Sequence, residues 1–106
     1  MQLRQPDLVL EVSDGRLFHI EFQLTNDKDM PIRMLRCYMQ ILEHYGKGAE
    51  QVVLYVGNLA LRMPKGIRKR RLVFEYGLRD IREIDSRKLL ESDRPEDMVL
   101  SILGKM

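Results

Sequence analysis

The sequence has a single cysteine and no long apolar run. Cys37 alone cannot form an internal disulfide or a zinc site built from cysteines. A membrane span needs roughly 18 consecutive apolar residues, and no segment approaches that length. Asp7 and Glu11 interrupt the N-terminal apolar run, which is not the pattern of a signal peptide. These absences predict a protein of the reducing cytoplasm with no membrane partner.

The chain also lacks a strong net charge. Its 18 Lys and Arg nearly balance its 16 Asp and Glu, so the formal net charge is only +2 and a polycationic nucleic-acid coat is excluded. Positive charge is nevertheless concentrated in the segment 65–71, which contains Lys65, Arg68, Lys69, Arg70 and Arg71. Clusters of this kind bind phosphate backbones. A solvated loop ahead of a strand is the equal alternative.

Length and composition indicate one domain. A chain of 106 residues is large enough for one hydrophobic core but not for two. The hydrophobic fraction of 44% is typical of globular proteins. No repeat, low-complexity tract or linker divides the chain, so we expect a single domain over residues 1–106.

The order of the hydrophobic patterns predicts an α/β fold with a mixed central β-sheet and flanking helices. Asn26, Asp27 and Asp29 are candidate N-caps, Pro31 suits a first helical turn, and Gly46 is a candidate C-cap. Apolar residues recur at helical spacing between these signals. The expected strands are 8–12, 17–24, 52–57 and 72–76, with 79–84 as an extension of the sheet, and the expected helices are 30–45, 87–91 and 95–103.

The turn after the first strand decides where the carboxylates point. A two-residue turn at Asp14 and Gly15 would pair Asp7 with Phe22, whereas a three-residue loop at 13–15, with Gly15 left-handed, would pair Asp7 with Glu21. The two-residue register would place carboxylates among phenylalanines, at a cost of several kcal/mol. The three-residue register instead separates a polar face from an apolar face. The apolar face would contain Leu8, Leu10, Val12, Phe18, Ile20, Phe22 and Leu24.

Two opposed carboxylates suggest a metal site. Directly opposed residues in a hairpin have Cβ atoms about 4.5–5.5 Å apart, so Asp7 and Glu21 would repel each other unless a cation lay between them. A hard ion such as Mg²⁺ takes one or two carboxylates and keeps several waters. Gln23 lies on the same face, where its amide could hold a water or a phosphate oxygen, and His19 and Glu11 flank the pair.

These residues also carry a family resemblance. Pro6-Asp7, thirteen residues and then Glu21-Phe22-Gln23 resemble the PD-(D/E)XK nuclease signature, with glutamine in the lysine position. The continuation at 30–38 (MPIRMLRCY) is similar to the helix that follows this motif in the Rpn family of recombination-promoting nucleases and putative transposases. The segments 53–57 and 89–92 are similar to that family too. The resemblance covers nearly the whole chain.

The resemblance implies a restriction-endonuclease-like core and metal-dependent hydrolysis of DNA, associated with transposition or recombination. Asp7 and Glu21 would bind Mg²⁺ or Mn²⁺, the backbone carbonyl of Phe22 would complete the metal shell, and Gln23 would orient the attacking water. Arg33 would contact phosphate, with a surface salt bridge as its alternative. Six residues precede Asp7, so we expect a domain that lacks the family's N-terminal helix.

Several other interpretations stay open. Asp7 and Glu21 could be carboxylates on a solvent-facing strand surface, in a catalytically inactive nuclease-fold module that binds DNA or a protein partner. We interpret His19 as a sheet-surface or partly buried residue, and Cys37 as a small core residue. A sheet that starts near the chain terminus also exposes an edge, through which a homo-oligomer could form.

Overall fold

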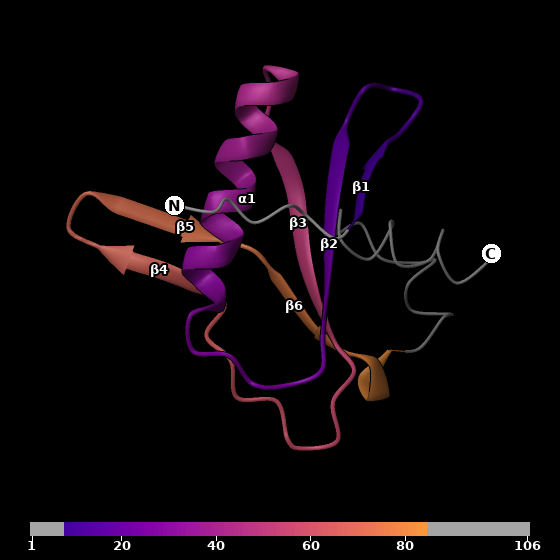
Figure 1. Ribbon diagram of the computed structural model, residues 1–106, viewed down its shortest axis with the longest axis vertical. Helices are drawn as coiled ribbons and strands as arrows, with labels where there is room; N and C mark the ends of the chain where they lie inside the picture. The colour runs from indigo at the N-terminus through magenta and orange to yellow at the C-terminus, as the bar shows by residue number, and fades with distance from the viewer. Residues whose placement is uncertain (1–7, 85–106) are drawn as a thin grey trace.

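The computed structural model describes residues 8–84. Its elements are β1 (Leu8–Glu11), β2 (Leu17–Gln23), α1 (Met30–Tyr45), β3 (Ala49–Tyr55), β4 (Gly66–Lys69), β5 (Leu72–Glu75), β6 (Gly77–Asp80) and the short 3₁₀ helix η1 (Ile81–Glu83). Four strands form a mixed sheet in the order β1-β2-β3-β6, and α1 lies in front of it (Figure 1). This confirms the expected α/β class with a mixed sheet. The helices expected at 87–91 and 95–103 lie outside the described residues.

The β1–β2 hairpin has the three-residue loop that the sequence predicts. Leu8 pairs with Ile20, and the antiparallel register continues unchanged to the turn. Gly15 has φ 89°, in the left-handed region. Its N–H donates to the Val12 carbonyl at 2.9 Å, and the Val12 N–H donates to the Arg16 carbonyl at 3.0 Å. The predicted register is therefore confirmed for the described strand pairs, while Asp7 lies outside the described residues.

Polar contacts hold the loop. The Asp14 carboxylate accepts hydrogen bonds from the Arg16 backbone N–H at 3.1 Å and from its guanidinium Nε at 2.8 Å. The backbone bond from Arg16 is the main reason why the pKa of Asp14 lies below its ordinary value. Lys47 donates to the carbonyl of Gly15 and lies 3.6 Å from a Glu11 carboxylate oxygen. The hairpin tip is thus tied to the segment that leads into β3.

The residues at its two ends determine where α1 begins and ends. Asp29 occupies the N-cap position and Pro31 lies in the first turn. The Asp29 side chain makes no capping hydrogen bond within the described residues; instead, its backbone N–H donates to Asp27 Oδ1 at 2.8 Å. At the other end, Gly46 has φ 74° and donates its N–H to Leu42, which ends the helix as expected.

The helix connects two parallel strands. β2 and β3 are parallel, with Leu17 opposite Ala49, and parallel neighbours need a long crossover connection of this kind. β3 begins at Ala49, earlier than the expected residue 52, because the full length of β2 is paired. Runs of buried residues at Leu17–Glu21 and Gln51–Tyr55 are typical of central strands covered on both faces.

β6 completes the main sheet alongside β3, with Val52 opposite Gly77. The strand expected at 79–84 is wrong beyond Asp80, where the chain turns into η1. The Asp80 carboxylate accepts the Arg82 backbone N–H at 3.0 Å. Its hydrogen bonds with the Arg82 side chain, more than this backbone bond, hold the pKa of Asp80 below its ordinary value. This local cap competes successfully with further strand pairing.

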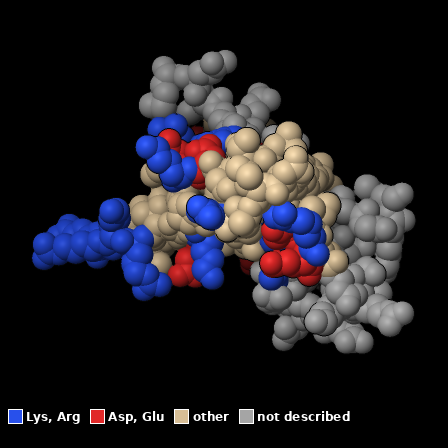
Figure 2. All heavy atoms as spheres, turned by 90° about the horizontal axis from the view of Figure 1, so that it is seen from below, with Lys and Arg blue, Asp and Glu red and all other residues tan. Residues whose placement is uncertain are grey.

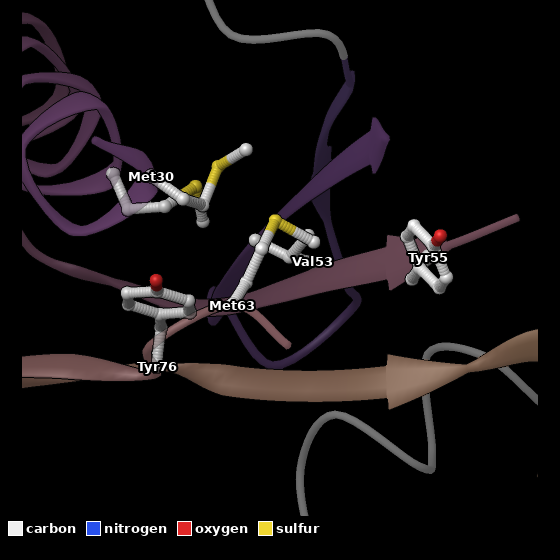
Figure 3. Close-up of a cluster of buried hydrophobic side chains, with 6 residues drawn as sticks. Met30, Val53, Tyr55, Met63 and Tyr76 are labelled. Atoms are coloured by element: carbon white, nitrogen blue, oxygen red, sulfur yellow. The ribbon is translucent and has the colours of Figure 1, made fainter. Parts of the chain in front are cut away.

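Two apolar clusters pack against opposite faces of the sheet. The cluster beneath α1 contains Met30, Met34, Val53, Tyr55, Met63 and Tyr76 (Figure 3). The other contains Phe18, Ile20 and Val52, with Leu8, Leu10 and Val12 packed against them. The sequence predicts that Phe22 and Leu24 are buried on this face as well. That prediction is wrong, because the two side chains are 45% and 70% exposed. They lie past the residues where β1 pairs with β2.

β4 and β5 form an antiparallel hairpin separate from the main sheet. We name residues 65–75 the basic arm. The strand expected at 72–76 exists as Leu72–Glu75 but pairs only within this hairpin among the described residues, and the segment 65–71 contains a strand and a turn, not a loop alone. The arm projects away from the sheet on the left of Figure 1. No helix among residues 8–84 is long and apolar enough to cross a membrane.

Candidate functional site

Glu21 lies in the middle of β2, on the sheet face covered by α1. Its side chain is only 2% exposed, and the side chains of His19 and Cys37 beside it are fully buried. Glu21 Oε1 lies 2.7 Å from His19 Nε2 and 3.8 Å from Cys37 Sγ. The predicted metal-binding carboxylate therefore belongs to a buried polar cluster contributed by β2 and α1.

Gln51 on β3 fixes the tautomer of His19. The Gln51 amide nitrogen donates to the Met34 carbonyl at 2.9 Å, which sets the orientation of the amide. The same nitrogen lies 2.9 Å from His19 Nδ1, so Nδ1 must accept. The proton of the neutral ring is then on Nε2, which donates to Glu21. A relay from the α1 backbone through Gln51 and His19 thus orients the Glu21 carboxylate.

The cluster offers three kinds of metal ligand. The imidazole, carboxylate and thiol atoms of His19, Glu21 and Cys37 lie within 4.8 Å of one another. Nitrogen and sulfur ligands suit Zn²⁺ better than Mg²⁺, which prefers oxygen. Coordination by His19 Nε2 would move its proton to Nδ1, where it would meet the amide hydrogens of Gln51. In the observed arrangement His19 orients the Glu21 carboxylate, whose oxygens are the kind of ligand that Mg²⁺ prefers.

Gln23 and Phe22, which the sequence assigns to the site, and Glu11, which flanks it, occupy separate positions along the hairpin strands. Gln23 is half-buried near the end of β2, where its amide donates to Thr25 Oγ1 at 3.3 Å. Phe22, whose carbonyl is the expected third ligand, pairs with Leu54 on the neighbouring strand. Glu11 pairs with Leu17 beside the turn, at the opposite end of the hairpin from the expected site.

Arg33 forms the salt bridge that was the alternative to a phosphate contact. Its Nη1 lies 2.6 Å from Asp27 Oδ2, and both side chains are partly exposed. Asp27 also affects Tyr76, whose pKa is raised mainly by burial and additionally by this nearby carboxylate. The Tyr76 hydroxyl donates to the Pro64 carbonyl at 2.5 Å. These contacts tie the start of α1 to the root of the basic arm.

The basic residues of the arm are on the surface. Lys65, Arg68, Lys69, Arg70 and Arg71 are all exposed. Arg68 lies 3.3 Å from a Glu75 carboxylate oxygen, yet its side chain remains 79% exposed. On the left of Figure 2, one group of Lys and Arg atoms projects beyond the body of the molecule. The structure therefore separates the predicted phosphate-binding residues of the arm from the buried Glu21.

Gln51 is the member of the cluster that the sequence did not indicate. It stands directly before the apolar residues of β3, where a polar residue is ordinary. Its partner His19 is 32 positions away in the chain, so no local spacing signals their contact. No protein-family model matches the chain, and no curated protein or solved structure is detectably similar to it.

Proposed function

We propose that this protein is a metal-dependent DNA endonuclease of the PD-(D/E)XK type, similar to the Rpn family and acting in transposition or recombination. The observation that supports it best is the register of the β1–β2 hairpin. Leu8 lies opposite Ile20, which is the register expected to pair Asp7 with Glu21. The order of hairpin, crossover helix and parallel strand is also consistent with the expected core.

In this proposal each group has a defined task. The bound metal ion would polarise the scissile phosphate and supply hydroxide at neutral pH. Glu21, oriented by His19, and Asp7 would provide carboxylate oxygens for that ion, with the Phe22 carbonyl as a further ligand. The Gln23 amide positions the attacking water, but it cannot neutralise the charge that develops on the phosphate because it is uncharged. The basic arm binds phosphates of the DNA backbone, whereas Arg33 is engaged in its salt bridge with Asp27.

Nicking of supercoiled plasmid in Mg²⁺ or Mn²⁺ tests the proposal. Glu21→Gln keeps the shape of the side chain and an acceptor for His19, but it removes the charge that a metal ion requires. We expect this variant, and Asp7→Asn, to lose more than about 100-fold in nicking rate, since even residues that only support metal ligands contribute 10–100-fold. Glu11→Gln is the matched control and should retain activity. Equal nicking by Glu21→Gln, or nicking in excess EDTA, would contradict the proposal.

The burial of Glu21 favours one alternative, a catalytically inactive module that binds DNA or a protein partner. Its Oε1 already accepts a hydrogen bond from His19 and contacts the Cys37 thiol, so in this alternative its task is to join β2 to α1. Under this alternative we expect DNA binding that depends on salt but not on EDTA, and no nicking at any metal concentration. Metal-dependent binding that Glu21→Gln abolishes would exclude it.

A further inference from the structure

The basic arm is a short β-ribbon with one anchored face. Paired residues share a face of a two-stranded ribbon, so Ile67 lies beside its partner Phe74. The Phe74 ring contacts the rings of Tyr38 and Tyr76, with centroids 6.0 Å away in each case. These aromatic contacts fix the root of the ribbon against α1 and the start of β6.

The other end of the ribbon carries the charge. Lys69 and Leu72 form the last pair, and Arg70 and Arg71 make the turn between the strands. Glu75, at the root, is the only carboxylate in residues 65–75. Positive potential therefore rises toward the outermost part of the arm, as the projecting Lys and Arg atoms in Figure 2 illustrate.

We propose that the arm inserts into the major groove of double-stranded DNA, which makes duplex DNA the substrate class of this protein. A major groove about 12 Å wide admits a two-stranded β-ribbon. Arg70 and Arg71 enter at the tip and bind phosphates that border the groove, as do the cations along the edges of the ribbon. Guanidinium groups suit this position because their forked N–H donors match phosphate oxygens. The inference rests on the proposed function for DNA as the substrate, but insertion of the arm requires no metal ion.

The composition of the arm disfavours other partners. A site for single-stranded nucleic acid stacks bases on exposed aromatic rings, whereas the one aromatic residue of the arm, Phe74, packs against Tyr38. A membrane-binding hairpin would place apolar residues at its outermost turn, where this arm has two arginines. Double-stranded RNA carries the same charge, but its deep and narrow major groove does not admit the ribbon.

Fluorescence anisotropy with the full chain in EDTA tests this inference without any cleavage. The probes are a DNA duplex of about two helical turns, one of its strands alone, and an RNA duplex of the same sequence. We expect the DNA duplex to bind at least about tenfold more tightly than the other two, because only its major groove is open to the ribbon.

Substitutions in the arm provide the second readout. Arg70→Ala with Arg71→Ala should weaken duplex binding about tenfold and reduce the slope of log K against log salt by roughly 2, because two phosphate contacts are lost. Arg70→Lys with Arg71→Lys should retain the full slope. Lys28→Ala with Arg36→Ala removes the same charge from exposed positions outside the arm and should leave both the slope and the DNA preference unchanged.

Equal affinity for the three probes would overturn the inference, because it would indicate a simple charged surface. An equal effect of the arm and control variants would overturn it too. So would arm variants that lose binding to phosphatidylserine vesicles but keep duplex binding, which would indicate a membrane site. All these binding measurements are made without metal. The inference about the arm can therefore be overturned while Glu21-dependent nicking persists, and the proposed nuclease activity can be absent while the arm still binds duplex DNA.

Discussion

The side chains of Gln51, His19 and Glu21 beneath α1 form a chain of hydrogen bonds among buried residues. Gln51 donates to both the Met34 carbonyl and His19, and His19 donates to Glu21. A buried polar group that loses its partner costs about 1–3 kcal/mol of folding free energy. The relay therefore stabilises only one placement of α1 on the sheet, and it holds the Glu21 carboxylate in one orientation.

Gln51→Leu tests this relay. The substitution conserves volume approximately, but it leaves His19 Nδ1 without its donor and removes the additional bond to the Met34 carbonyl. We expect the free energy of unfolding in urea to fall by about 1–3 kcal/mol. Gln40→Leu, a partly exposed position on α1, is the matched control and should change stability by no more than about 0.5 kcal/mol. Equal stability of the two variants would mean that the Gln51 bonds contribute nothing net.

At the scale of elements, local signals predicted the structure well. The prediction of the hairpin loop depended on Gly15, and the prediction of the end of α1 depended on Gly46. Both residues have the positive φ that their positions require. The burial argument about Asp7 and Phe22 also selected the correct register. Each of these inferences used residues close together in the chain, where backbone geometry alone decides the outcome.

Gly15→Ala measures how strongly the loop depends on this backbone conformation. A Cβ at Gly15 would lie 3.5 Å from Lys47 Nζ, an ordinary contact, so the cost comes from φ 89°. We expect a loss of about 1–2 kcal/mol in unfolding free energy for alanine, and a smaller loss for Gly15→Asn because asparagine tolerates this region better. Thermal or urea unfolding checks both values. An alanine variant as stable as the wild type would show that the loop can adopt another turn.

The basic arm shows where element prediction failed. Residues 72–76 have the composition of a strand, and that assignment is correct for Leu72–Glu75. Composition did not reveal that this strand would pair with the charged segment before it instead of joining the main sheet. The choice depends on contacts at the root, such as that between Phe74 and Tyr38, which join residues far apart in the chain.

At the scale of the whole molecule, the fold class followed from the order of the elements, but the cluster around Glu21 did not. Its side chains come from β2, α1 and β3, and they meet only because the crossover helix covers the polar face of β2. Sequence patterns separated the two faces of the hairpin correctly. They did not indicate which face α1 would cover, because polar residues at 19, 21 and 51 are normally a sign of exposure.

In the proposed nuclease, this burial would make metal binding a property of the whole fold. A metal ion held by Glu21 binds the folded chain and not the unfolded one, so it must raise the stability of the protein by about 2.7 kcal/mol at 100 times its dissociation constant. For a domain of this size each kcal/mol raises the melting temperature by roughly 4–8 °C. The proposed nuclease should therefore show a melting temperature that rises with Mn²⁺ concentration in differential scanning fluorimetry.

The increase on adding Mn²⁺, and not the melting temperature itself, is the quantity to compare among variants. Glu21→Gln alters buried hydrogen bonds and changes the metal-free melting temperature for that reason alone. If Glu21 is a ligand, its variant loses the increase, while Glu11→Gln, beside the exposed turn, keeps it. If neither wild type nor variant responds to excess metal, the carboxylate serves only to join β2 to α1, and the metal-dependent mechanism fails. Duplex binding by the arm would be unaffected by that result, because the arm and the Glu21 cluster are built from separate residues.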